Sequence, residues 1–314
     1  MTALRKRLRF NPLLRPSLGF ALLAVFLLLW PGFAAAVDPH AVRHGEGRLW
    51  RVERSGAPAS HIMGTIHIAD PRVRDLPRPI LRAFKSSRRA AFELLVGPAE
   101  RQEITTSRRL PQGRSLAAVL GRETYEKAVK HAQRYGLPED AIEGLRPSSL
   151  AFLFQISPEE FRRQMDGDLV LDAWLIQYAY DLGMQVVALE HIEEQLSLLT
   201  DTSLEEEAEM LRQVLVKLEE RPGARSELID SYLAGNMSPV YQLVERMARE
   251  NAEPGARAFK EQFLDARNRT MVNRMIPLLK QGRAFIAVGA LHMPGDEGIL
   301  HLLEQQGFRV TRVY

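Results

Sequence analysis

Strand-like and helical segments alternate at both ends of this chain, and this alternation restricts its fold more than any other feature. Residues 49–53 alternate between apolar and polar side chains, and a Ser-Gly turn joins them to residues 60–66, which predicts a β-hairpin. Similar runs predict further strands at residues 89–92, 185–189, 283–288 and 308–313. Because parallel strands need crossover connections, the helical segments between these runs indicate a sheet that is at least partly parallel.

Most of the chain between the strands is predicted to be helical. Apolar residues recur at helical spacing in segments 76–87, 122–135, 147–156, 168–182, 204–220, 226–234, 238–250, 256–280 and 298–306. Pro277 is expected to kink the helix at 256–280 near its end. Residues 185–189 form a continuous apolar run, which is typical of a covered strand. The sequence therefore predicts an α/β (α+β) fold, in which a central mixed, partly parallel sheet is flanked by helices and carries a large helical insert.

Residues 1–36 have the layout of a secretory signal peptide. Basic side chains within residues 5–9 precede an apolar run at residues 18–30, and three alanines at residues 34–36 form a small-residue cleavage pattern. The apolar run has 13 residues, whereas about 20 are needed to span a bilayer. We therefore expect export followed by cleavage.

An uncleaved N-terminal membrane anchor is the alternative, with attachment through residues 18–37. In both cases the rest of the chain is expected on the extracytoplasmic side, as a periplasmic or secreted protein or as one that is anchored there. Residues 37–48 are then a linker, and residues 49–314 are the folded domain. The sequence leaves the oligomeric state open.

Charge and cysteine content exclude several classes of function. The chain has 42 Lys and Arg against 39 Asp and Glu, but five of the bases and none of the acids lie in residues 1–36. The rest of the chain is therefore slightly acidic, and we expect no nucleic-acid partner. Because the chain contains no cysteine, disulfides, thiol catalysis, cysteine-ligated zinc and iron–sulfur clusters are excluded.

A histidine or a glutamate follows each of four predicted strands. His67 and His292 follow the strands at 60–66 and 283–288, and Glu93 and Glu190 follow those at 89–92 and 185–189. Ligands of open α/β sheets bind at the carboxyl ends of the strands, so we expect these four side chains to converge there. Imidazoles and carboxylates together suit a divalent ion such as Mn, Fe, Co or Zn. The pattern predicts a metal site formed by His67, His292, Glu93 and Glu190.

The two histidines share a local sequence frame. Gly64 and Gly289 each precede a histidine by three residues, and Pro71 and Pro294 follow. Glycine allows another backbone or a ligand to approach closely, and proline ends the strand and turns the chain. We therefore expect each imidazole to point into a cleft at the end of the sheet.

A metal ion at this position would support hydrolysis. It can lower the pKa of a bound water from about 15.7 toward about 7, and a carboxylate off the metal can act as general base. Asp70, three residues past His67, is the expected residue to orient that imidazole. Asp172 and Trp174 lie on an apolar helix and are expected to be core or rim residues.

Each of these residues also has a structural explanation. A single histidine after a strand is often only a hydrogen-bonded structural residue. Glu93 can form an ion pair with Arg88 or Arg89. The negative charge of Glu190 can stabilise the N-terminus of the helix that begins near His191. The repetition of the pattern at four strand ends nevertheless favours a site.

At these residues the sequence resembles the TraB/GumN family, which includes the Tiki proteins and the pheromone-shutdown protein PrgY. The resemblance covers residues 49–314. It rests on the motifs Met63-Gly-Thr-Ile-His67, Phe92-Glu-Leu94, Ala188-Leu-Glu-His-Ile-Glu-Glu-Gln-Leu196, Arg267-Asn268, Val288-Gly-Ala-Leu-His-Met-Pro-Gly295 and Gln306-Gly-Phe-Arg-Val310. One difference is Met293, where the family more often has Leu.

The resemblance implies a fold related to the erythromycin-esterase and ChaN-like proteins and, from the animal Tiki members, a divalent-metal-dependent peptidase. It implies that His67 and His292 are metal ligands and that Glu93 is a ligand or a base. Glu190 and the Arg267-Asn268 pair would line the site. From the residues alone, Arg267 has two alternatives: it clamps a substrate carboxylate or oxyanion, or it forms an ion pair with Asp265 or Glu261.

Three functions are compatible with the sequence. The first is an extracytoplasmic metal-dependent hydrolase, most simply a peptidase that acts on a peptide or protein and uses Mn, Co or Zn. The second is a protein of the same fold that binds a peptide or haem without turnover. The third is a membrane-associated interaction protein in which the motif residues only brace the sheet. Binding of a divalent ion separates the first from the third.

Overall fold

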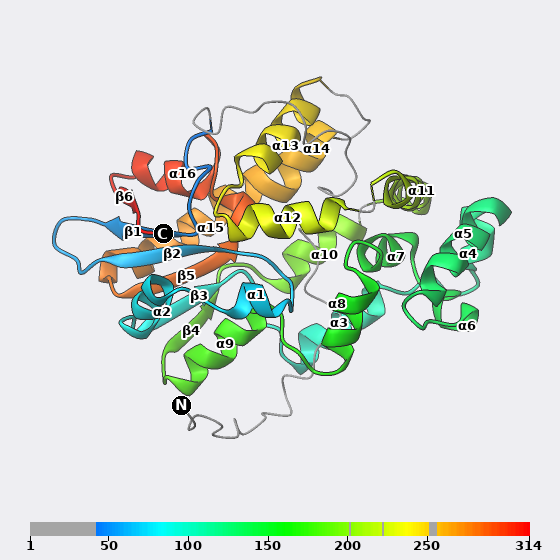
Figure 1. Ribbon diagram of the computed structural model, residues 1–314, viewed down its shortest axis with the longest axis horizontal. Coiled ribbons are helices and arrows are strands. Elements are labelled where there is room, and N and C mark those ends of the chain that lie inside the picture. The colour runs from blue at the N-terminus through cyan, green and yellow to red at the C-terminus, as the bar shows by residue number, and fades with distance from the viewer. Residues whose placement is uncertain (1–41, 201, 222, 251–255) are drawn as a thin grey trace.

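The computed structural model describes residues 42–314 except residues 201, 222 and 251–255 (Figure 1). The predicted signal peptide or anchor, and the part of the predicted linker up to residue 41, lie outside the described residues. Within the described ranges, no helix combines the length and the apolar character that crossing a membrane requires.

A mixed sheet forms the centre of the described chain, with the strand order β4-β3-β5-β2-β1-β6. Its strands are β1 (Leu49–Glu53), β2 (Ser60–Thr65), β3 (Arg89–Phe92), β4 (Gln185–Ala188), β5 (Ala284–Gly289) and β6 (Arg309–Arg312). β2, β3, β4 and β5 are parallel, whereas β1 is antiparallel to both β2 and β6. The predicted hairpin, strands and mixed α/β fold are confirmed.

Helices cover both faces of this sheet, as Figure 1 shows. The helices outside the insert described below are α1 (Pro71–Arg74), α2 (Arg78–Lys85), α9 (Leu171–Asp181), α10 (Ile192–Thr200), α12 (Ala224–Leu233), α13 (Ser238–Glu250), α14 (Ala256–Lys260), α15 (Ala266–Gln281) and α16 (Ile299–Gln305). Two short elements accompany them, the π-helical segment η4 (Glu261–Asp265) and the 3₁₀ turn η5 (Ala290–His292).

Side chains of β5 alternate between two apolar layers because successive residues of a strand point to opposite faces. Phe285 contributes to the layer that contains Phe84 of α2, and the two rings meet edge to face with centroids 4.9 Å apart. Ile286 contributes to the opposite layer, with Met275 of α15 and Leu300 of α16. β5 is buried along its whole length, as a central parallel strand should be.

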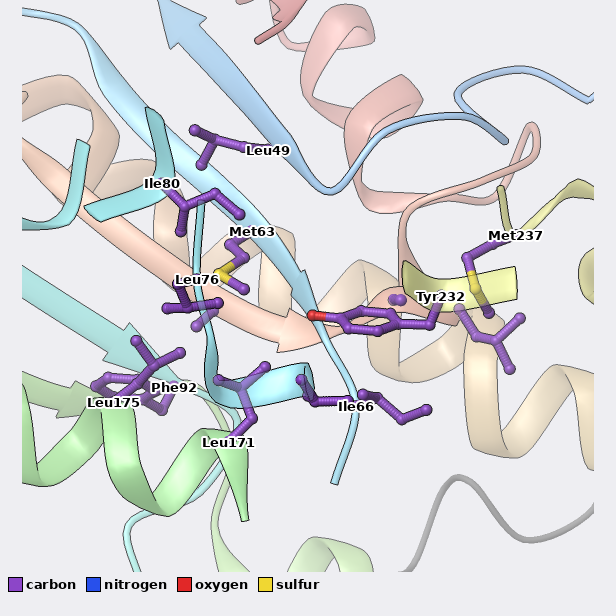
Figure 2. Packing of buried hydrophobic residues seen from close by; sticks show 14 of the residues in the cluster. Leu49, Met63, Ile66, Leu76, Ile80, Phe92, Leu171, Leu175, Tyr232 and Met237 are labelled. Carbon is purple, nitrogen blue, oxygen red and sulfur yellow. The ribbon is translucent and has the colours of Figure 1, made fainter. Parts of the chain in front are cut away.

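Figure 2 shows the first of these layers, with Met63, Ile80, Phe92 and Leu175 packed together. These side chains come from β2, α2, β3 and α9, so the layer joins the ends of two strands to two helices. Complete burial of such a side chain contributes about 1.5–3 kcal/mol. The layer thereby fixes the strand ends from which the candidate site residues project.

The helical insert has an apolar core of its own, at the right of Figure 1. Its helices are α3 (Pro98–Ser107), α4 (Leu116–Leu120), α5 (Arg122–Gln133), α6 (Glu139–Ile142), α7 (Pro147–Leu153), α8 (Pro158–Met165) and α11 (Leu204–Glu220). Phe154 and Leu211 are central to this core. Glu207 is fully buried and accepts hydrogen bonds from Arg146 and Ser148, which ties α11 to α7.

Two details of the sequence-based prediction are wrong. β4, expected to be covered, is the last strand of the sheet, and Gln185 and Ala188 are exposed because only β3 pairs with it. The helix expected at 256–280 is interrupted by η4, and α15 continues past Pro277 to Gln281. A π segment is common near functional sites, and this one ends just before Arg267.

Candidate functional site

The parallel strands bring the four predicted residues to one edge of the sheet. Thr65 at the end of β2 lies opposite Gly289 at the end of β5, and Phe92 at the end of β3 lies opposite Ala188 at the end of β4. His67, Glu93, Glu190 and His292 therefore all follow carboxyl ends of strands at the same edge. The prediction that each of them follows a strand is confirmed.

The turn that carries His292 packs tightly against β2. A Cβ atom at Gly64 would lie 3.0 Å from the Cα and 3.1 Å from the Cβ of Ala290, the first residue of η5. A larger side chain at position 64 would thus push η5 away from β2. This close approach explains why glycine stands three residues before His67.

Arg267 joins the two glutamates. Its Nε and Nη2 donate to the two carboxylate oxygens of Glu190 over 2.7 and 2.6 Å, and Nη2 also donates to Glu93 Oε2 over 3.1 Å. The remaining nitrogen, Nη1, donates to the carbonyl of Phe263 at 3.3 Å. All three side chains are buried. Arg267 therefore pairs with the site carboxylates, and not with Asp265 or Glu261.

Glu190 is fully engaged within the protein. Oε1 accepts from Arg267, and Oε2 accepts from Arg267 and, at 3.0 Å, from Gln195 of α10. Arg274 donates to the carbonyl of the preceding Leu189 and so holds the same turn. In this arrangement both oxygens of Glu190 accept hydrogen bonds from protein donors, and Glu190 orients Arg267.

Glu93 is engaged differently from Glu190. Its Oε2 accepts from Arg267, and its Oε1 accepts from the backbone N–H of Gly289 over 2.5 Å. Oε1 also lies 3.9 Å from Nε2 of His292. Glu93 thus links the end of β3 to the end of β5 and faces the imidazole.

His292 is fully buried and is held by one edge of its ring. Its Nδ1 lies 2.5 Å from Oδ1 of Asn268, and Nδ2 of Asn268 donates to the carbonyl of Glu297. Because that amide nitrogen is already a donor, Oδ1 is the acceptor, and Nδ1 of His292 carries the proton. Nε2 is left as an acceptor without a hydrogen-bond partner among the described residues. Burial and the Arg267 charge hold the His292 pKa well below its usual value.

His67 is held by the same edge of its ring, but by a carboxylate. Its Nδ1 lies 2.9 Å from Oδ2 of Asp172, and Oδ1 of Asp172 accepts from the Thr65 hydroxyl over 2.6 Å. Burial lowers the His67 pKa, but the Asp172 carboxylate outweighs burial and raises this pKa to about 9. Glu93 also acts on His67, so the charges on β2, β3 and α9 influence one another.

One sequence-based expectation for the surroundings of His67 is wrong. Asp70 does not orient the imidazole; it caps α1 and binds Arg72, since its carboxylate lies at the helix N-terminus. Asp172 is buried, as expected of a core residue, and it also contacts His67 directly. The signal that identifies Asp172 is an acid in the first turn of an otherwise apolar helix, since a buried carboxylate requires a partner.

The donor atoms suit a divalent metal, although they are not gathered around one point. Among the described residues, no three His, Asp or Glu side chains form a metal-binding group. Two ligands of one ion with bonds of about 2.0–2.2 Å lie at most about 4 Å apart, and His292 Nε2 and Glu93 Oε1 meet this limit. The unpartnered Nε2 of His292 and its proton on Nδ1 are what a metal-ligating histidine requires. His67, His292 and Glu93 therefore fit such an ion by donor type.

Comparison with known proteins gives a family and a set of relatives. The profile of the TraB/PrgY/gumN family matches residues 48–312. A protein named metalloprotease TIKI2 from Danio rerio is 29% identical over 314 residues, which cover 83% of this chain and 60% of that protein. A protein named metalloprotease TIKI1 from Homo sapiens is 27% identical over 309 residues, with 83% and 61% covered. The chain thus spans about three fifths of the length of these relatives. No solved structure matches it.

Proposed function

This chain belongs to the TraB/PrgY/gumN family, and on that premise we propose that it is a metal-dependent protease that cleaves a peptide or protein. The name metalloprotease on its curated relatives supports a divalent ion and a peptide substrate. The candidate ions are Mn, Co and Zn, in keeping with imidazole and carboxylate donors.

His67, His292 and Glu93 would hold the ion, with each histidine binding through Nε2. A bound ion supplies a water whose pKa is lowered from about 15.7 toward about 7. His292 supports this assignment because its Nε2 is buried, neutral and without a partner among the described residues. Glu93 supports it because Oε1 faces that nitrogen at 3.9 Å.

The charge of the site carries the proposal. Three buried carboxylates, those of Glu93, Glu190 and Asp172, surround the two imidazoles. Among the described residues, the guanidinium that contacts them is that of Arg267, and protonated His67, with a pKa raised to about 9, offsets one more carboxylate. One negative charge then remains, and two remain when both imidazoles are neutral. Uncompensated buried charge is costly. A divalent cation with two neutral imidazoles would balance these charges.

The other residues of the site would position the proposed metal ligands. Arg267 directs Nε, Nη1 and Nη2 at protein acceptors, so we assign it to holding Glu93 and not to clamping substrate. Glu190 holds Arg267 in turn. Asn268 fixes the proton of His292 on Nδ1.

We also propose that the protein acts outside the cytoplasm. The support is the sequence of residues 1–36, with basic residues followed by an apolar run and a small-residue cleavage pattern. N-terminal sequencing of the exported protein tests this proposal. A mature chain that begins near residue 37 would support cleavage, and an intact leader would support an anchor.

Proteolysis is tested with the full-length chain and an unbiased peptide library analysed by mass spectrometry. We expect cleavage in the presence of Mn, Co or Zn, loss of cleavage in chelator, and recovery when metal is restored. His67→Ala/His292→Ala and Glu93→Gln should abolish cleavage. Glu194→Gln is the matched control, because Glu194 follows Glu190 by four residues and its carboxylate pairs, among the described residues, with Arg274 and the His191 N–H.

The outcomes separate the alternatives. Metal binding without cleavage of any peptide would indicate a binding protein of the same fold. If the wild-type chain binds no divalent ion and behaves like the double variant, the protease proposal is wrong. The site would then be a structural brace at the end of the sheet.

A further inference from the structure

The first turn of α9 contains an acid that is almost fully buried. Asp172 is 5% exposed, although the other residues of that turn are apolar. Its two carboxylate oxygens have different partners, the hydroxyl of Thr65 at 2.6 Å and Nδ1 of His67 at 2.9 Å. Each oxygen is thus committed to a residue at the end of β2.

The fold fixes this carboxylate against β2 by several contacts. Thr65 ends β2, and His67 lies two residues further on. Thr65 donates a hydrogen bond to Asp172, and His67 forms an ion-pair contact with the same carboxylate. Leu171 at the start of α9 donates its N–H to the carbonyl of Ile68, directly after His67. Ala69 packs with Val170 and Ala173 in a small apolar cluster. The N-terminus of α9 and the chain around His67 therefore form one unit.

A carboxylate is favoured at this position. It lies at a helix N-terminus, where the backbone dipole stabilises negative charge. Its Oδ2 lies 2.9 Å from Nδ1 of His67. A carboxylate oxygen accepts hydrogen bonds, so this contact requires that Nδ1 carry a proton.

We infer that Asp172 is a positioning residue that keeps the proton of the neutral His67 imidazole on Nδ1, so that Nε2 is the nitrogen that binds a divalent ion. The part that concerns the ion rests on the proposed function. The part that concerns the imidazole depends only on the contacts among Thr65, Asp172 and His67. Carboxylate–histidine pairs of this kind fix ring orientation and raise the basicity of the ligand.

A purely structural ion pair makes a different prediction. It would contribute to stability, but it would not determine which ring nitrogen binds the metal. The Asp172→Asn variant distinguishes the two roles because it keeps the shape of the side chain. Its oxygen still accepts from Thr65, so its NH₂ group faces His67, and Nδ1 must then accept a hydrogen bond. The proton of a neutral His67 moves to Nε2 and blocks the ligand position.

The first measurement is the Nδ1 proton of His67 in the NMR spectrum of the full-length, metal-free chain above pH 9, where the imidazole is neutral. This proton is identified by its absence in His67→Gln. We expect this proton in the wild type and its loss in Asp172→Asn. The wild-type spectrum alone tests the inference even if the variant does not fold. A wild-type His67 without an Nδ1 proton would overturn it.

The second measurement is cobalt(II) affinity, followed by visible absorption. We expect Asp172→Asn to bind cobalt(II) about 10–100-fold more weakly than the wild type. Asp70→Asn is the matched control, because Asp70 is also a buried acid close to His67 but binds Arg72. It should leave both the Nδ1 proton and the cobalt affinity unchanged. Equal cobalt affinity in Asp172→Asn and the wild type would overturn the inference.

The two proposals fail separately. If the wild-type chain binds no cobalt(II), manganese(II) or zinc(II), the protease proposal fails. The Nδ1 proton of His67 still decides whether Asp172 fixes the imidazole, since that measurement needs no metal.

Discussion

The two histidines of the site have the same local frame and opposite electrostatic surroundings. Each follows a glycine by three residues, and each is held at Nδ1 by a side chain from the first turn of a helix. The group that contacts Nδ1 is the carboxylate of Asp172 for His67 and the amide of Asn268 for His292. Asp172 raises the His67 pKa to about 9, whereas burial and the Arg267 charge lower the His292 pKa well below its usual value.

The difference shows that the strands and the helices make separate contributions to the site. The strand ends and their glycines place both imidazoles at one edge of the sheet. The helix α9, far along the chain from His67, supplies the Asp172 carboxylate that raises the His67 pKa. Burial and the Arg267 charge from α15 lower the His292 pKa. His67 is therefore the more basic imidazole of the two. His292 is neutral, and its Nε2 has no hydrogen-bond partner among the described residues.

Removal of the positive charge of Arg267 should have the largest effect on stability. Arg267→Met leaves Glu93 and Glu190 buried and unpaired, so we expect the free energy of unfolding to fall by about 3–5 kcal/mol. In urea titrations, Arg269→Met is the control, because Arg269 is exposed and should contribute about 0–1 kcal/mol. Similar losses in both variants would contradict the described arrangement.

The pH dependence of stability should separate the two histidines in the metal-free chain. Since the folded pKa of His67 is raised from about 6.5 to about 9, its contribution is fully present below pH 6.5 and is lost as pH rises through 9. This contribution amounts to at most about 3 kcal/mol. Since the folded pKa of His292 is lowered, its cost appears only as pH falls below about 6.5.

These two effects are measured by urea unfolding in chelator at several pH values. His67→Gln should remove the loss of stability between pH 6.5 and 9, and His292→Gln should leave that loss in place. Conversely, His292→Gln should reduce the loss of stability on the acid side. A wild-type curve that is flat between pH 6.5 and 9 would refute the assigned role of Asp172 in raising the His67 pKa.

An exchange of the amide for a carboxylate should make the two histidines alike. Asn268→Asp gives His292 the same partner that His67 has, so its pKa should rise, as NMR titration would show. The variant also leaves the Glu297 carbonyl without its donor, at a cost of about 1–3 kcal/mol. An unchanged His292 pKa would mean that the side chain at position 268 does not influence this pKa.

The smallest expected effect on stability concerns Gly64, the glycine three residues before His67. Gly64→Ala places a Cβ about 3.0 Å from Ala290, so η5 must shift by a few tenths of an ångström. Overpacking of this kind costs about 1–3 kcal/mol, and we expect the lower end here because one methyl group is added. Urea unfolding measures the loss, and a shift of the His292 resonances would report the movement.

The strand ends could be predicted from the sequence because they depend on local patterns. The hairpin, the four parallel strands and the placement of His67, Glu93, Glu190 and His292 follow from apolar runs that end at a polar residue. The order of the strands and the exposed position of β4 could not be predicted, since strand pairing depends on contacts between distant segments.

The partners of the site residues were harder to predict. Arg267 bonds Glu190, 77 residues away in sequence, and Asp172 reaches His67 from another helix. The sequence offered nearer partners, Asp70 for His67 and Asp265 for Arg267. Those local acids have other roles, since Asp70 caps α1 and Asp265 pairs with Lys260.

The most direct test of the site is X-ray absorption spectroscopy of the full-length chain loaded with one equivalent of cobalt(II). The account predicts a bound ion with nitrogen and oxygen ligands and outer-shell scattering from two imidazoles, reduced to one imidazole in either His67→Gln or His292→Gln. A spectrum of hydrated cobalt, or one that neither substitution changes, would contradict it.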